Sequence, residues 1–218
     1  KAYRNYRGLY GPEMVFRSNE KSRVFVKVTK TKVLAAFGQI IEVLFSRFFL
    51  DHVFVMEAGS SIVSAWHQDI GYYCVDGKQS VSFWIALDDI SKEGCLECIA
   101  GSHLSNTLHK PKRFNGNDLY ENDNSKEVPD INSNRKDYKI LSWDIKAGDA
   151  VAFDFRTLHG ASENINKNSR RRVFSARIVG DDAFFVDRQG KGSPPFENIK
   201  LKTGDKLTGR EFPIIYKV

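Results

Sequence analysis

The chain has 218 residues, 41% of them hydrophobic and 12% aromatic, which is enough material for one domain with a substantial core. Its formal charge is +6, but outside the cluster SRRRVF the basic residues are mostly scattered and interleaved with acidic ones, which argues against a nucleic-acid-binding protein. No apolar run is long enough to cross a bilayer and the first residues do not resemble a signal peptide, so we expect a cytoplasmic protein without membrane contact.

The first pattern along the chain is a set of apolar residues spaced three and four apart between positions 31 and 50. Such spacing is typical of an amphipathic helix, and it predicts one helix that covers a sheet. The residues that define this pattern are Val33, Leu34, Phe37, Ile40, Ile41, Leu44, Phe45 and Phe48.

From position 51 onwards, the sequence reads as short strands separated by Gly, Asp and Asn turns, which predicts a sandwich or barrel of antiparallel strands. A polar segment at 104–137 interrupts them, and a segment of that length without periodicity predicts a lid-like insertion. Residues 183–218 are rich in turn residues and are expected to wrap around the domain as coil. The strand segments begin with HVFVME and SSIVSAWHQD, and continue through SVSFWIALDD, CLECIAGSH, the stretch YKILSWDIKAGDAVAFDFRTLHGA, and RRRVFSARIVGDD.

The three cysteines are Cys74, Cys95 and Cys98. The spacing in CLEC suits zinc, but no second Cys/His pair accompanies it to complete a tetrahedral site. Buried, reduced thiols are therefore the preferred interpretation, and they indicate a reducing compartment.

The segment WHQD carries the chemistry. His67 and Asp69 come at the end of a predicted strand, and residues two apart in an extended chain project to the same face, so both can reach one ion. Among the other histidines (His52, His103, His109 and His159), His159 is the best third ligand, because it ends an apolar strand that can return beside the first. Two imidazoles and one carboxylate suit ferrous iron with three open positions. A solvated strand edge and a zinc hydrolase remain alternatives for these residue types.

In order and context, these segments resemble the phytanoyl-CoA dioxygenase family of Fe(II)- and 2-oxoglutarate-dependent oxygenases. The resemblance runs from about position 51 to 182 and implies one mainly β domain over 1–218, a double-stranded β-helix (a cupin-like jelly roll) with flanking α-helices. The matching segments are WHQDIGYY, SFWIALDDISKEGCLECIAGSH, AGDAVAFDFRTLHGASEN and RRRVFSAR.

The resemblance also implies roles for single residues. His67, Asp69 and His159 would bind iron, and an arginine on the strand after His159 would pair with 2-oxoglutarate. Ungapped counting favours Arg170 for this role, whereas the alternation of side chains favours Arg171, which we prefer. Trp84, Thr157 and Ser175 are expected near the co-substrate, and Tyr72 and Tyr73 are expected to line the substrate pocket.

The expected activity is hydroxylation of a small-molecule or acyl substrate by dioxygen, with release of succinate and CO2. Related halogenases lack the carboxylate ligand, so the presence of Asp69 favours hydroxylation. A non-catalytic metal-binding jelly roll and a zinc hydrolase on a similar scaffold are the alternatives. The sequence names neither the substrate nor the oligomeric state.

Overall fold

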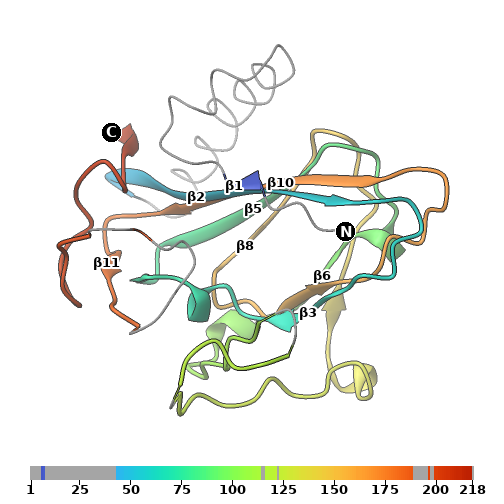
Figure 1. Cartoon of the computed structure of the whole chain (residues 1–218), viewed down its shortest axis with the longest axis horizontal. Coiled ribbons are helices and arrows are strands. Elements are labelled where there is room, and N and C mark those ends of the chain that lie inside the picture. The colour runs from blue at the N-terminus through green and yellow to red at the C-terminus, as the bar shows by residue number, and fades with distance from the viewer. Residues whose placement is uncertain are drawn as a thin grey trace.

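The computed structural model describes residues 6–7, 43–113, 116–121, 123–188, 196 and 199–217. Two antiparallel sheets that face each other dominate this part of the chain (Figure 1). This arrangement confirms the mainly β jelly roll that the sequence predicted. The strands are β1 (Tyr6–Arg7), β2 (Phe45–Met56), β3 (Ser64–His67), β4 (Val75–Asp76), β5 (Ser80–Ala86), β6 (Leu96–Ile99), β7 (Ile140–Leu141), β8 (Ala150–Phe153), β9 (His159–Ala161), β10 (Arg171–Val179), β11 (Phe184–Phe185) and β12 (Ile214–Lys217).

The helices in the described part of the chain are single 3-10 turns in the connections between strands. They are η2 (Ile70–Tyr72), η3 (Lys92–Gly94), η4 (Ser102–Leu104) and η5 (Arg135–Asp137). No helix among the described residues is long and apolar enough to cross a membrane.

The larger sheet has the strand order β1-β2-β10-β5-β8, with β12 also paired to β2. On β10, Ser175 lies opposite His52 of β2 and Trp84 of β5, and Arg177 lies opposite Ser82. Because side chains alternate along a strand, β10 has two different faces. One face carries Arg171, Val173, Ser175 and Arg177, and the other carries Phe174, Ala176 and Ile178.

The smaller sheet has the order β3-β9-β6-β7 and lies below the larger one in Figure 1. Apolar side chains fill the space between the sheets: Val173 and Trp84 from the larger sheet pack with Leu96 and Cys98 from the smaller one. The opposite face of β10 contributes Phe174, Ala176 and Ile178 to a second apolar cluster. The larger sheet is therefore buried on both faces along β10 and β5, as the continuous burial of β5 also shows.

The helix predicted over 31–50 is corrected in part. Residues 31–42 lie outside the described residues, but residues 45–50 form the first half of β2 rather than a helix. The reason is that β2 is covered from both sides: Phe48 packs in the same cluster as Phe174, whereas Phe49 packs in a different cluster with Phe155. A strand buried on both faces has a nearly continuous apolar sequence, which is easily taken for a helical pattern.

The insertion at 104–137 covers the outer face of the smaller sheet over part of its length. Val128, Ile131 and Tyr138 pack against Ile99 of β6 and Trp66 of β3. This segment lies at the bottom of Figure 1, below β3 and β6. Its role as a lid stays a prediction, but residues 128–138 have a structural role as a cover for this sheet.

The described residues of the C-terminal segment are mostly coil and turn, and they contribute two short strands. β11 pairs with β4, and β12 pairs with the beginning of β2. Leu207 and Phe212 from the intervening coil are fully buried against Phe49. The tail thus completes one end of the core.

Candidate metal centre

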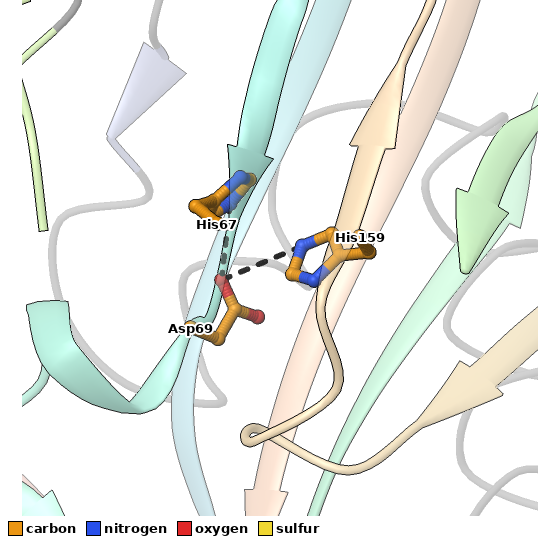
Figure 2. Close-up of side chains that lie close together, drawn as sticks. All are labelled: His67, Asp69 and His159. Atoms are coloured by element: carbon orange, nitrogen blue, oxygen red, sulfur yellow. Dashed lines mark ion pairs between the residues drawn. The ribbon is translucent and has the colours of Figure 1, made fainter. Parts of the chain in front are cut away.

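His67 and His159 are brought together by the pairing of β3 with β9. The two residues are direct cross-strand partners in this antiparallel pair. Their rings lie 4.2 Å apart between centroids, and Figure 2 shows both imidazoles on the same side of the strands. The late strand therefore does return beside the early one, as the sequence interpretation required.

Each imidazole is oriented by a hydrogen bond from its Nδ1 atom. His67 Nδ1 donates to the carbonyl oxygen of Ala65 at 2.7 Å, and His159 Nδ1 donates to that of Thr157 at 2.9 Å. A carbonyl oxygen only accepts, so the proton of a neutral ring must reside on Nδ1. Nε2 of both rings is then left as a lone-pair donor, which is how metal-binding histidines are commonly fixed.

Asp69 lies in the turn between β3 and η2, and its Oδ1 atom faces both Nε2 atoms. The distances from Oδ1 are 3.8 Å to His67 Nε2 and 3.9 Å to His159 Nε2 (Figure 2). The donor atoms of the three residues all lie within 4.8 Å of one another. A single metal ion can therefore be bound by one atom from each residue.

Asp69 is held as an anion. Burial alone would raise its pKa, but the positive charge of Arg177 and a hydrogen bond from Ser82 hold the pKa of Asp69 below its ordinary value. Burial, reinforced by repulsion from His67, lowers the pKa of His159 to about 3. A charged carboxylate and a neutral imidazole are the protonation states that metal ligation requires.

This donor set fits ferrous iron. Two imidazoles and a carboxylate on one face of an octahedron leave three positions for other ligands, and this combination is characteristic of non-haem iron(II) oxygenases. A structural zinc site would close its tetrahedron with a fourth protein ligand. No such residue joins His67, Asp69 and His159 among the described residues.

Arg171 and Arg170, the two candidates for co-substrate binding, lie in different environments. Arg171 is 6% exposed on the inner face of β10, where its guanidinium donates to the carbonyl oxygens of Gly94 and Ser162. The side chain of Arg170 is 55% exposed and forms an ion pair with Glu57 at 3.4 Å. Of the two, only Arg171 lies inside the jelly roll, as the alternation of side chains along the strand predicted.

Trp84, Ser175 and Thr157 are all buried. Trp84 and Ser175 face each other across β5 and β10, on the face that carries Arg171. Thr157 precedes β9 and contributes its backbone carbonyl to His159. Their predicted contacts with the co-substrate stay predictions.

The two tyrosines after the metal motif differ from each other. Tyr72 has its ring 5.6 Å from the ring of His67, so it lies at the edge of the centre. Tyr73 is 2% exposed and packs in the core against Phe49 and Phe155. Its predicted contact with a substrate stays a prediction.

The structure adds Gln68, Ser82 and Arg177 to the site. Gln68, between the two ligands of the motif, is 3% exposed and forms hydrogen bonds to Thr107, His109 and Arg156. Ser82 and Arg177 both donate to Asp69. Alternation along β10 placed Arg177 on the inner face, but nothing in the sequence indicated its contact with Asp69. The cysteines stay outside the centre: Cys95 and Cys98 are buried free thiols.

The fold resembles solved structures of low sequence identity. The carbocyclase SnoK from nogalamycin biosynthesis, described as non-heme and alpha-ketoglutarate-dependent, has a TM-score of 0.68 at 19% identity, over 98% of this chain and 75% of that one. The epimerase SnoN from the same biosynthesis has a TM-score of 0.68 at 18% identity, over 100% and 82% of the two chains. EvdO2 from Micromonospora carbonacea var. aurantiaca, solved with 2-oxoglutarate, gives 0.56 at 18%, over 80% and 69%.

No curated protein matches this sequence significantly. The phytanoyl-CoA dioxygenase (PhyH) family matches residues 7–172, which include all three residues of the metal centre. Most of the chain is therefore covered by one family description, and the jelly roll and the triad agree with it. The chain belongs to the phytanoyl-CoA dioxygenase family.

Proposed function

We propose that this protein is an Fe(II)- and 2-oxoglutarate-dependent dioxygenase that hydroxylates a small-molecule or acyl substrate. The observation that carries the proposal is the convergence of His67, Asp69 and His159, whose donor atoms lie within 4.8 Å of one another. Membership of the phytanoyl-CoA dioxygenase family supports the same chemistry.

The roles of the residues follow from their positions. His67, Asp69 and His159 hold the metal, and the buried guanidinium of Arg171 binds the distal carboxylate of 2-oxoglutarate. A guanidinium suits this task because it stays charged and can bond both carboxylate oxygens at once. When bound, iron and 2-oxoglutarate supply the activation of dioxygen, with release of succinate and CO2. The apolar interior formed by Trp84, Val151 and Phe153 limits the access of water.

A small-molecule substrate is supported by the solved structures that share the fold. SnoN is described in complex with Fe3+, alpha-ketoglutarate and nogalamycin RO. These structures are named as a carbocyclase, an epimerase and a monooxygenase, so the fold is compatible with several outcomes of the same oxidation. We favour hydroxylation for this chain, since Asp69 retains the carboxylate ligand.

The test is turnover of 2-oxoglutarate. Purified protein loaded with Fe(II) should release succinate from 2-oxoglutarate under air, and the same protein loaded with Zn(II) should not. Asp69→Ala should abolish succinate release, because the metal loses its only anionic protein ligand. A panel of candidate substrates, scored by stimulated succinate release and by product mass, then identifies the reaction.

The two alternatives give different results in the same experiment. A non-catalytic metal-binding protein would bind Fe(II) and release no succinate under any condition. A zinc hydrolase would be active with Zn(II) and would ignore 2-oxoglutarate. Wild-type turnover by Asp69→Ala would show that the assigned centre is wrong.

A further inference from the structure

Arg177 is a buried cation next to the metal centre, and the function proposed above gives it no role. It lies on the inner face of β10, opposite Ser82 of β5, and it is 6% exposed. Arginine stays protonated in proteins, so its burial requires partners that compensate the lost hydration. The nearest anionic partner that the structure records is Asp69, whose Oδ2 atom lies 3.3 Å from Arg177 Nε.

The two oxygens of Asp69 have different surroundings. Oδ1 faces the Nε2 atoms of His67 and His159 at 3.8 and 3.9 Å. Oδ2 accepts hydrogen bonds from Ser82 Oγ at 2.6 Å and from Arg177 Nε at 3.3 Å. Oδ1 thus points toward the position of the metal, whereas Oδ2 is hydrogen-bonded to two residues of the larger sheet.

Arg177 is itself fixed from two further sides. Its Nη1 atom lies 2.9 Å from His52 Nδ1, and since a guanidinium only donates, the imidazole nitrogen is the acceptor. Its guanidinium carbon lies 5.4 Å from the centroid of the Tyr73 ring, in a cation–π contact. These contacts restrict the directions in which Arg177 can present its donor to Asp69.

The number of oxygens that Asp69 contributes matters for an iron centre of this type. An octahedral ion bound by two histidines and one carboxylate oxygen keeps three positions open. A keto acid that chelated the ion through two atoms would, together with dioxygen, need all three. If Asp69 rotated and bound through both oxygens, one of these positions would be lost.

We propose that Arg177 is a positioning residue that holds Asp69 Oδ2, so that Asp69 binds iron through Oδ1 alone and the third open position stays available. This inference rests on the proposed function. It extends that function by naming a residue that acts on the metal only through a ligand. Partners of metal ligands commonly contribute 10- to 100-fold to metal affinity or activity.

The test compares substitutions at Arg177 with the same substitutions at Arg172. Arg172 is the neighbouring arginine of β10 on its outer face, where it forms an ion pair with Asp88. Arg177→Lys keeps the positive charge beside Asp69 but lacks the planar fork that bonds Asp69 and His52 together. Arg177→Met also removes the charge. If Arg177→Met does not fold because Asp69 is left without compensation, Arg177→Lys alone decides the question.

Three measurements are needed for each variant, one structural and two in solution. The first is a crystal structure of the Mn(II) complex, which reports how many oxygens of Asp69 bind the metal. The second is succinate release with Fe(II), and the third is the Kd for Mn(II). Arg177→Lys should bind Mn(II) with a Kd within about 3-fold of wild type, yet lose about 10-fold or more in kcat, with Asp69 rotated or bound through both oxygens. Arg172→Lys and Arg172→Met should match wild type.

Wild-type turnover and single-oxygen binding by Asp69 in Arg177→Lys would overturn the inference, because charge compensation would then be the whole role of Arg177. A folded Arg177→Lys protein that no longer binds Mn(II) would overturn it as well, since Arg177 would then be needed for the site to form. Failure of the proposed function has a different signature: the wild-type protein releases no succinate, while the Mn(II) structures still report the binding of Asp69.

Discussion

His159 lies directly opposite His67 on the neighbouring strand, and the glycine that follows it allows the two strands to approach closely. A Cβ atom on Gly160 would be 3.0 Å from the carbonyl oxygen of Ser64 and 3.3 Å from Cδ2 of Trp66, both on β3. The separation of β3 and β9, and with it the distance between the two imidazoles, therefore depends on a residue without a side chain.

Gly160→Ala is expected to push β9 away from β3 and to displace His159. Overpacking of this kind typically costs about 1–3 kcal/mol in the free energy of unfolding. Mn(II) affinity should fall together with stability, and both can be measured by calorimetry and urea unfolding. Gly94→Ala is the matched control, because the nearest side-chain atom to its Cβ would be at an ordinary 3.7 Å. Equal effects of the two substitutions would refute the close-approach explanation.

Substitution of the two neighbouring arginines should distinguish the co-substrate ligand. Arg171→Ala should raise the Kd for 2-oxoglutarate by about 10- to 100-fold, because hydrogen bonds to charged groups contribute about 1.5–3 kcal/mol. Arg170→Ala should leave the Kd for 2-oxoglutarate unchanged, because Arg170 is exposed and forms only a surface ion pair with Glu57. The measurement is titration calorimetry of the metal-loaded protein without oxygen. The reverse order of effects would assign the role to Arg170.

Gln68 is expected to couple the metal motif to the insertion. Its amide accepts from His109 N at 3.0 Å and donates to Thr107 O at 3.2 Å, while Tyr72 Oη accepts from Lys112 N at 3.0 Å. Gln68→Ala should cost about 1–3 kcal/mol in the free energy of unfolding, since buried partners lose their hydrogen bonds.

Hydrogen exchange can test separately the hydrogen bonds that Gln68 and Tyr72 accept from the insertion. The amide of His109 should exchange faster in Gln68→Ala, whereas Tyr72→Phe should accelerate the amide of Lys112 instead. If neither amide changes, these hydrogen bonds do not hold the insertion in solution.

Asp51 provides a pH-dependent prediction. Burial raises its pKa to about 6, and its backbone hydrogen bond and Arg177 only partly oppose this effect. The unfolded chain has a value of about 3.9, so the folded state holds this proton more tightly. The contribution of Asp51 to the free energy of unfolding is therefore complete below the pKa of the unfolded chain, and it is lost as the pH rises through about 6.

Asp51→Asn stays neutral and should therefore be more stable than wild type at pH 7.5, by up to about 3 kcal/mol. The gain should shrink as the pH is lowered to 5. Urea unfolding of both proteins across this range is the measurement, with the exposed Glu163→Gln as control. A stability difference that does not depend on pH would show that Asp51 does not titrate as described.

The sequence by itself identified the three candidate ligands whose donor atoms converge in the structure. Two donors two residues apart in a strand must share a face, and a histidine that ends a later apolar strand is the natural third ligand. Alternation along RRRVFSAR correctly separated the inward Arg171 from the exposed Arg170. The shared face of residues 67 and 69 and the separation of the two arginines could be predicted because both depend on the local geometry of an extended chain. The pairing that places His159 beside His67 is long-range and comes from the fold.

Only the tertiary structure decided the rest, because those features depend on what packs against a segment. Residues 45–50 are strand rather than helix because both faces of β2 are covered, and Tyr73 is a core residue because Phe49 and Phe155 enclose it. The contact of Arg177 with Asp69 depends on how distant segments of the chain pack together, and no local sequence pattern indicates this. Periodicity reports which side chains share a face, but the partner of that face is set by the fold.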